Sequence, residues 1–394
     1  MRLIHLSDLH LGKRVNEFSM IEDQQYILTK IINMIDEEKP DGVIIAGDIY
    51  DKSVPNEEAV KLLNDFLMRL AKRKLQVYII SGNHDSAVKL SFASGLIDLS
   101  GIHFAPVYDG NIVSFSLGSG AEKVKIYMLP FIKPATVRTI FPEEKTDDYT
   151  DAVRVAISHM EIDEKACNIL VAHQFVTGAT RSESEEISIG GLDNVNASVF
   201  EPFAYVALGH IHGPQHIGRE TVRYCGTPLK YSFSEVNHHK SVTIVDIVTE
   251  AEEQPVTIHT GEMMSQQVTI RTRELIPLHD MRIIKGTYEE LTNRCNYENT
   301  SVDDYLQIVL TDEEDIPDAM GKLRVIYPNL MLLKYDNKRT RENRGITDAV
   351  DVENKSPLTL FEEFYEMQNN QKMSEIQHDF VKKLMDSIWK GDRL

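Results

Sequence analysis

Short apolar runs and longer amphipathic segments alternate along roughly the first 250 residues of the chain. The apolar runs are rich in Val and Ile, which is typical of strands that a sheet buries on both faces. They occupy residues 3–6, 42–46, 77–80, 169–172 and 205–208. Residues 22–39 and 55–72 repeat apolar side chains at helical spacing, and Pro40 ends the first of these segments. Strands and amphipathic helices in alternation predict an α/β layered domain, which we place at residues 1–260.

The pattern changes after residue 260, where a smaller α+β domain is predicted at residues 261–336. Its expected strands are 267–272, 281–285, 305–310 and 330–335, and its expected helices are 288–293 and 316–326. A polar stretch at 337–356 has the composition of a linker. Residues 357–394 then repeat apolar side chains such as Phe380 and Leu384, which predicts helices. Such a stripe fits local packing and docking onto a partner protein equally well.

Composition narrows the class of protein without naming a function. A chain of 394 residues is too long for one ordinary core, and 42% hydrophobic with 26% charged residues is typical of a soluble globular protein. No run approaches the roughly 20 apolar residues of a membrane span, and no signal peptide is recognised, so we expect a cytoplasmic protein. The three separated cysteines, Cys167, Cys225 and Cys295, predict neither disulfides nor a thiolate zinc site.

The net charge of −19 opposes nucleic-acid binding at long range. Bound divalent cations or a partner subunit could offset this repulsion locally. The densest basic stretch lies at residues 322–344 and fits either a solvated face with a linker, which we prefer, or a contact with the DNA backbone. Its basic residues are Lys322, Arg324, Lys334, Lys338, Arg339, Arg341 and Arg344.

Each of the five predicted strands is followed by side chains of the types that commonly bind metal ions, namely Asp, His or Asn. In chain order they are Asp8 and His10, then Asp48, then Asn83, then His173, and finally His210 and His212. Because sites in layered α/β folds form at the carboxyl ends of strands, we expect these side chains to converge. Carboxylate, imidazole and amide ligands without a thiolate suit Mn²⁺, Fe²⁺ or Zn²⁺, and a redox-silent hydrolytic role follows.

One such motif taken alone is better explained as a turn with a satisfied polar residue. Five of them in order, each at the end of a strand, favour a metal centre. Gly47, Gly82 and Gly209 precede ligands and fit sharp turns that need a positive φ. We expect His5 to be packed in the first strand and Asp51 to be a turn residue near the rim of the site, able to face a substrate.

The five motifs DLH, GDIYD, GNHD, VAH and GHIH resemble those of the calcineurin-like metallophosphoesterase superfamily. Longer stretches are similar to SbcD, the family of nuclease subunits of bacterial SbcC/SbcD DNA repair complexes, and the chain layout matches over nearly the whole length. These stretches are HLSDLHLGK, SESEEISIGG, YVALGHIH and YCGTPLKYSFSE. The resemblance implies a layered β-sandwich flanked by helices, with an α+β capping domain and C-terminal partner-binding helices.

The resemblance also implies a division of the ligands between two divalent ions, for which we expect Mn²⁺. Asp8, His10, Asp48 and His212 would hold one ion, and Asp48, Asn83, His173 and His210 the other, so that Asp48 bridges them. Two ions roughly 4 Å apart activate a water and stabilise both oxygens of a displacement at phosphorus. His84 would orient the scissile phosphate or protonate the leaving oxygen, and Asp85 would fix His84 from behind.

The resemblance further implies an SbcC ATPase partner and double-stranded DNA ends and hairpins as substrates. The implied activity is an ATP-dependent 3′–5′ exonuclease and endonuclease that works as a homodimer within a heterotetramer. The segments 55–72 and 90–99 are candidate dimer surfaces, although their apolar faces could simply pack on the sheet.

Three other functions compete with this one. Protein phosphatases of this fold carry an Arg after GDxxD and read GNHE, whereas this chain has Lys52 and Asp85. A phosphodiesterase for small molecules would usually end before the second domain. A scaffold that has lost catalysis should lack some ligands, and this chain lacks none.

Overall fold

The computed structural model describes residues 1–91, 94–118, 123–163, 166–185, 193–249, 266–338, 340, 357–369 and 372–389. Nearly all of the predicted linker at 337–356, residues 186–191 of the SESEEISIGG stretch, and Arg339, Arg341 and Arg344 lie outside the described residues. The chain divides into two compact units, Met1–Ile283 with Asp303–Leu306, and Ile284–Val302 with Gln307–Leu394. The domain limits given above stay predictions.

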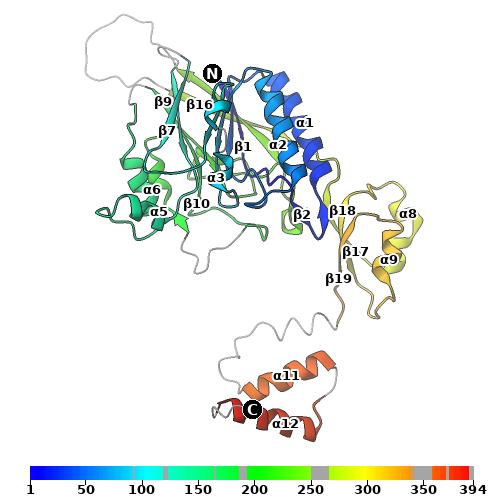
Figure 1. Cartoon of the computed structure of the whole chain (residues 1–394). Coiled ribbons are helices and arrows are strands. Elements are labelled where there is room, and N and C mark those ends of the chain that lie inside the picture. The colour runs from blue at the N-terminus through cyan, green and yellow to red at the C-terminus, as the bar shows by residue number, and fades with distance from the viewer. Residues whose placement is uncertain are drawn as a thin grey trace, which may run out of the picture. The chain divides into compact units, whose positions relative to one another are not determined.

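Two six-stranded sheets form the first unit (Figure 1). The first sheet has the order β16-β15-β1-β4-β5-β6, and β1, β4, β5 and β6 run parallel. Its strands are β1 (Arg2–Leu6), β4 (Gly42–Ala46), β5 (Gln76–Ile80), β6 (Ile102–Ala105), β15 (Ser241–Thr249) and β16 (Gln266–Glu274). The first three confirm the predicted strands to within one residue at each end.

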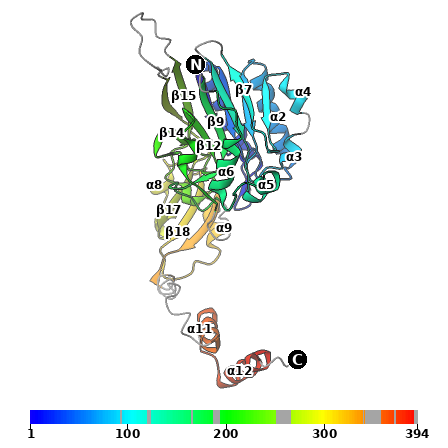
Figure 2. The ribbon, with the colours of Figure 1, turned by 90° about the vertical axis from the view of Figure 1, so that its left-hand side faces the viewer.

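The second sheet has the order β13-β14-β12-β9-β8-β7, and its four central strands run parallel (Figure 2). Its strands are β7 (Val113–Leu117), β8 (Val124–Leu129), β9 (Cys167–His173), β12 (Tyr205–Gly209), β13 (Gln215–Ile217) and β14 (Arg219–Tyr224). The central strands β9 and β12 contain the two remaining predicted runs and are buried along their whole length. Burial on both faces explains why these strands read as continuous apolar runs.

The inner core lies between the two sheets, where Ile44 and Tyr78 of the first sheet meet Ile169 and Ala207 of the second. Helices cover the outer faces (Figure 1). They are α1 (Ile21–Glu38), α2 (Glu57–Ala71), α3 (Ala87–Leu90), α4 (Ser94–Asp98), α5 (Pro134–Ile140) and α6 (Tyr149–Ser158). The α1 helix buries Ile27, Ile31 and Ile35 on one face and ends at the left-handed Lys39, just before Pro40. This arrangement is the predicted layered fold.

The strand predicted at 267–272 does not open the second domain, and this assignment was wrong. As β16 it pairs antiparallel with β15 from Ser241↔Glu274 to Thr249↔Gln266. Arg271 on this strand donates hydrogen bonds to Glu38 at the end of α1, with Nη1 at 2.9 Å from Oε1. Alternating apolar and polar residues predict that a segment is a strand, but they do not identify the strand with which it pairs. The residues between β15 and β16 in the sequence are outside the described residues.

The C-terminal part of the chain carries the three-stranded sheet β17-β18-β19 and several short helices. Its elements are β17 (Met281–Gly286), α7 (Tyr288–Thr292), α8 (Arg294–Tyr297), β18 (Tyr305–Leu310), α9 (Ala319–Arg324) and β19 (Leu330–Tyr335). The α9 helix is shorter than predicted because Asp318 adopts a left-handed backbone with φ of 51°. The predicted tail helices are α11 (Pro357–Asn369) and α12 (Glu375–Trp389). Among the described residues, no helix is long and apolar enough to cross a membrane.

Candidate metal centre

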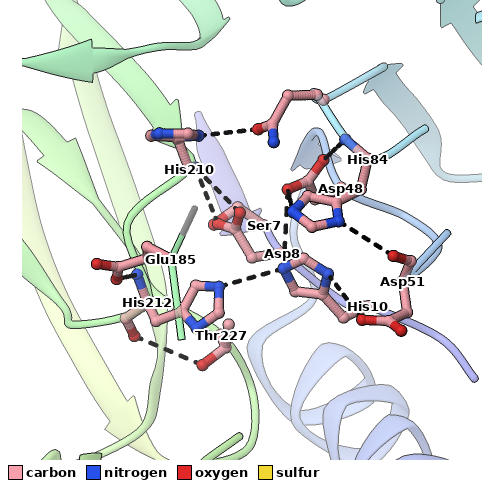
Figure 3. Close-up of polar contacts among 12 residues, drawn as sticks. Ser7, Asp8, His10, Asp48, Asp51, His84, Glu185, His210, His212 and Thr227 are labelled. Atoms are coloured by element: carbon pink, nitrogen blue, oxygen red, sulfur yellow. Dashed lines mark hydrogen bonds and ion pairs between the residues drawn. The ribbon is translucent and has the colours of Figure 1, made fainter. Parts of the chain in front are cut away.

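The carboxyl ends of five strands from both sheets meet at one place, where all seven predicted ligands lie. Main-chain hydrogen bonds join the loops that follow β1 and β4, because the amides of Asp8 and His10 donate to the carbonyls of Gly47 and Asp48 at 3.0 Å. Side chains from these two loops meet His210 and His212, which follow β12 of the second sheet (Figure 3). The convergence that the strand ends predict is therefore present in the structure.

Four of the seven predicted ligands have a left-handed backbone. The φ angles are 51° at Asp8, 44° at His10, 48° at Asp48 and 105° at His210. Residues other than glycine rarely adopt this region, which costs on the order of 1–3 kcal/mol each and is found mainly at functional sites. The backbone is held in this shape by the surrounding structure, which directs these side chains inward.

Glycines next to the ligands are required by space. A Cβ on Gly209 would lie 1.8 Å from the carbonyl oxygen of Ala46, and a Cβ on Gly82 would lie 2.1 Å from Oδ1 of Asp48. At Gly47 a Cβ would lie 2.3 Å from Nδ1 of His173. Only Gly47 of the three has a positive φ, so the predicted reason holds for that residue and close approach explains the other two.

Asp48 lies at the centre of the ligand cluster. Its Oδ2 is 3.7 Å from Nε2 of His10 on one side and 3.4 Å from Nε2 of His173 on the other. The Asp8 carboxylate also belongs to this centre, since ligand atoms of Asp8, Asp48 and His173 all lie within 4.8 Å of one another. Asp48 therefore lies between His10 and His173, with one carboxylate oxygen near both rings.

The remaining ligands form a group on either side of Asp48. On one side, Nε2 of His10 faces Nε2 of His212 at 3.2 Å. On the other side, Oδ1 of Asn83 lies 3.1 Å from Nε2 of His173 and 2.9 Å from Nδ1 of His210. The His10–His212 pair and the Asn83–His173–His210 group each fall within one of the two ion sets that the family resemblance implies. Asp8, which the resemblance puts with His10 and His212, lies close to Asp48 and His173.

The electrostatics of the cluster fit a bound cation. Burial lowers the pKa of His210 to about 3, so its ring is neutral, as a metal ligand must be. Burial also lowers the pKa of His173, but the Asp48 carboxylate outweighs this and raises it to about 9. Two buried ring nitrogens, Nδ1 of His10 and Nε2 of His210, have no hydrogen-bond partner. The donor set therefore suits divalent ions, which would supply the positive charge that these groups favour.

His84 lies beside the ligands with its ring fixed. Its Nδ1–H donates to the main-chain carbonyl of Asp51 at 3.0 Å, and its own amide donates to Oδ1 of Asp48 at 2.9 Å. Its Nε2 lies 4.0 Å from Oδ2 of Asp48. The ring thus presents Nε2 to the centre and remains free to meet a substrate.

Asp85 does not hold His84, and the predicted contact between them was wrong. Its carboxylate accepts hydrogen bonds from the amides of Ile49, Tyr50 and Gly82, each at 3.0 Å. A short acidic side chain in a loop readily bonds to nearby main-chain amides instead of to a ring. Asp85 therefore fixes the loops that follow β4 and β5. The main-chain carbonyl of Asp51, and not Asp85, holds the ring of His84.

Several residues behind the ligands were not foreseen from the sequence. Ser184 and Glu235 contact the ring of His212, and Glu185 accepts a hydrogen bond from its main-chain amide. Their only sequence signal is that they lie in SESEEISIGG and YCGTPLKYSFSE, two of the stretches that resemble the SbcD family. Asp51, expected near the rim, pairs with Lys13 at 2.7 Å. His5 is packed, as expected, with Nδ1 at 2.9 Å from the Tyr205 hydroxyl.

Comparison with known proteins places this centre in a family. The model of the calcineurin-like phosphoesterase family matches residues 1–214, and that of the type 5 capsule protein repressor C-terminal domain matches residues 277–369. The SbcD subunit of the nuclease SbcCD from Staphylococcus epidermidis is 31% identical over 393 residues, which cover 98% of this chain and 99% of that protein.

Two solved structures are more distant. The protein TT1561 of Thermus thermophilus is 10% identical and has a TM-score of 0.37, with 61% of this chain and 92% of that chain covered. A novel archaeal phosphodiesterase is 11% identical and has a TM-score of 0.28, with 69% of this chain and all (100%) of that chain covered.

The family-model match and the near full-length relative confirm the predicted fold class and the predicted enzyme class, a metal-dependent phosphodiesterase. The chain belongs to the calcineurin-like phosphoesterase family and, within it, to the family of SbcD nuclease subunits.

Proposed function

We propose that this chain is a Mn²⁺-dependent DNA nuclease subunit that hydrolyses phosphodiesters at double-stranded ends and hairpins in DNA repair, recombination and replication. The observation that carries the proposal is the position of Asp48, whose Oδ2 lies within 4 Å of both His10 and His173. Asp8 and His212 would complete one ion site, and Asn83 and His210 the other. The relative from S. epidermidis, a nuclease subunit by name, supports DNA as the substrate.

Two bound divalent ions would supply an activated water and charge stabilisation for displacement at phosphorus. The chain's own residues would do the rest. Because Nδ1 of His84 is held by the Asp51 carbonyl, Nε2 is the atom left to carry a proton to the leaving oxygen. Asp85 keeps the loops of Asp48 and Asn83 in place through the three amides that it binds.

We propose an SbcC ATPase as the partner, docked on α11 and α12. Both helices expose apolar side chains, of which Phe364 is 55% exposed, Phe380 67% and Ile376 84%. Such a partner would also offset the net charge of −19, which opposes DNA binding by this chain alone. The proposal includes ATP-dependent 3′–5′ exonuclease and endonuclease activity in the cytoplasm.

A homodimer within a heterotetramer is the proposed assembly. The helices α2 and α3 and the residue that follows α4 expose apolar side chains, with Met68 51% exposed, Val88 77% and Leu99 86%. These residues are the ones that a second copy of the chain would cover.

The test compares substrates on the purified chain with Mn²⁺, with and without SbcC and ATP. Linear duplex DNA, a DNA hairpin, a small phosphodiester and a generic phosphomonoester are incubated separately. We expect cleavage of both DNA substrates, lost in Asp48→Asn. Hydrolysis of the monoester or the small diester alone would overturn the proposal.

A further inference from the structure

His212 is held on every polar atom except Nε2. Its ring Nδ1 lies 2.8 Å from Oγ of Ser184 and 3.1 Å from Oε1 of Glu235. Its amide donates to Oε1 of Glu185 at 2.6 Å, and its carbonyl accepts from Nζ of Lys240 at 2.9 Å. Only Nε2 is left to face the cluster, where it meets His10.

The group behind His212 is a buried ion pair. The side chains of Glu235 and Lys240 are 0% and 4% exposed, and Oε2 lies 2.6 Å from Nζ. Lys240 directs its other hydrogen bonds to the His212 carbonyl and, at 2.6 Å, to Oγ1 of Thr227. Nζ of Lys240 thus has three acceptors, and an opposite charge 2.6 Å away favours the ionised form of Glu235.

The donors and acceptors fix the proton on the ring. An ionised carboxylate only accepts, so the Ser184 hydroxyl, 2.5 Å from Oε1 of Glu235, donates its single proton there. Oγ of Ser184 then has only lone pairs to offer to His212. Nδ1 of His212 therefore carries the proton, and Nε2 holds a lone pair directed at the cluster.

The other ligand histidines are held differently. Nδ1 of His173 donates to the main-chain carbonyl of Ala46 at 2.8 Å, which no substitution removes directly. Nδ1 of His10 has no hydrogen-bond partner, and the nearest carboxylate oxygen, of Asp51, is 3.9 Å away. Nδ1 of His210 lies 2.9 Å from Oδ1 of Asn83, which is itself a predicted ligand. Among the described residues, His212 is thus the ligand histidine whose ring bonds to side chains outside the predicted ligand set.

We propose that Ser184, Glu235 and Lys240 are positioning residues that lock His212 as the Nδ1–H tautomer and raise the affinity of the ion site formed with His10. The inference rests on the proposed function, since it assumes two ion sites around Asp48. A carboxylate behind a ligand imidazole orients the ring and makes it a stronger base, and loss of such a group typically costs about 10- to 100-fold in metal affinity.

The first experiment needs no metal. The full chain is labelled with ¹⁵N-histidine, stripped of metal, and its ring nitrogens are recorded by NMR, with the His212 signals assigned by their loss in His212→Asn. We expect a protonated Nδ1 and a bare Nε2 in the wild type. A proton on Nε2 in the wild type would overturn the inference.

The second experiment titrates Mn²⁺ into the full chain by calorimetry. Glu235→Gln keeps the shape of the side chain, and we expect it to weaken one of two ions about 10-fold or more while the other is unchanged. Asp23→Asn is the matched control, since Asp23 is 0% exposed but bonds to His279 and Tyr305. Equal weakening of both ions by Glu235→Gln, or no change, would contradict the proposed role.

A double variant distinguishes two possible roles of Glu235, orienting the His212 ring and neutralising the charge of Lys240. If Glu235 served only to neutralise Lys240, Glu235→Gln with Lys240→Met would restore Mn²⁺ affinity; we expect no restoration. A wild type that binds fewer than two Mn²⁺ ions would overturn the two-metal function, whereas the NMR result on the metal-free chain still decides the role of Ser184 and Glu235.

Discussion

Nδ1 of His84 donates a hydrogen bond to the main-chain carbonyl of Asp51, 3.0 Å away, although the two residues are 33 positions apart in the chain. The contact leaves Nε2 as the one ring atom that can exchange a proton with a substrate. His84 is not among the seven predicted ligands, although its Nε2 lies 4.0 Å from Oδ2 of Asp48.

Replacing His84 with Ala should lower kcat for DNA hydrolysis about 10²- to 10⁴-fold, because a general acid typically contributes that much. Mn²⁺ binding measured by calorimetry should be unchanged, since His84 is not among the seven predicted ligands. DNA cleavage at the wild-type rate would remove His84 from its proposed role.

A side chain at Gly209 should destabilise the protein. In Gly209→Ala the new Cβ would lie 1.8 Å from a main-chain carbonyl oxygen, which cannot move without shifting β4. Overpacking of this kind costs roughly 1–3 kcal/mol of the free energy of unfolding. Urea denaturation measures the loss, and Gly95→Ala is the control, because nothing lies within 4 Å of a Cβ there.

Metal removal should lower thermal stability. Ligands that bind only the folded state stabilise it by about 2.7 kcal/mol at 100 times their Kd. Mn²⁺ added to the stripped protein should therefore raise Tm, and Asp48→Asn should abolish the rise because both proposed ion sites would share that carboxylate. Asp98→Asn, at a carboxylate that pairs with His103, should behave like the wild type. A full Tm rise in Asp48→Asn would show that the ions bind elsewhere.

Acid should weaken the contact between α1 and β16. Hydrogen bonds from Arg271 lower the pKa of Glu38 from 4.5 to about 2 in the folded chain. The contact therefore contributes stability above pH 4.5, and this contribution is lost as the pH falls towards 2. Glu38→Gln should be less stable than the wild type at neutral pH, and the difference should shrink in acid. Urea denaturation across this range tests it, and a constant difference would contradict the assignment.

Introducing a negative charge among the exposed apolar side chains of α11 and α12 should abolish binding of the proposed SbcC partner. Phe364→Glu and Phe380→Glu place a carboxylate where apolar side chains are 55% and 67% exposed. We expect loss of co-purification with SbcC and no change in Mn²⁺ binding. Glu366→Ala, at an exposed polar position on α11, is the control. Intact co-purification of both Phe variants would place the SbcC contact elsewhere.

The convergence of the seven predicted ligands could be foreseen because each lies at or just after the end of a buried strand. His173 ends β9 and His210 follows β12, its parallel neighbour. The groups behind the ligands could not be foreseen. Glu235 and Ser184 meet across 51 positions, and no local period records such a contact. Asp85 was placed wrongly for a related reason, since a carboxylate beside a histidine can turn to main-chain amides of a loop far away in the sequence.

The edge of the first sheet was also hard to predict, for the same reason. β16 has the alternation of a strand, but that alternation does not identify β15 as its partner. The five buried strands β1, β4, β5, β9 and β12 are continuous apolar runs, and α1 and α2 repeat apolar side chains at helical spacing. These elements were predicted from the sequence.

A left-handed backbone lowers the stability of the fold at four of the predicted ligands. These residues are Asp8, His10, Asp48 and His210. Glycine at any of these positions would relax the main chain and at the same time delete a ligand. Substitutions to glycine at these positions would therefore lower the backbone strain of the folded state while removing the side chains of the proposed metal centre. Substitutions that stabilise the main chain at these four positions should therefore be the ones that dismantle the proposed metal centre.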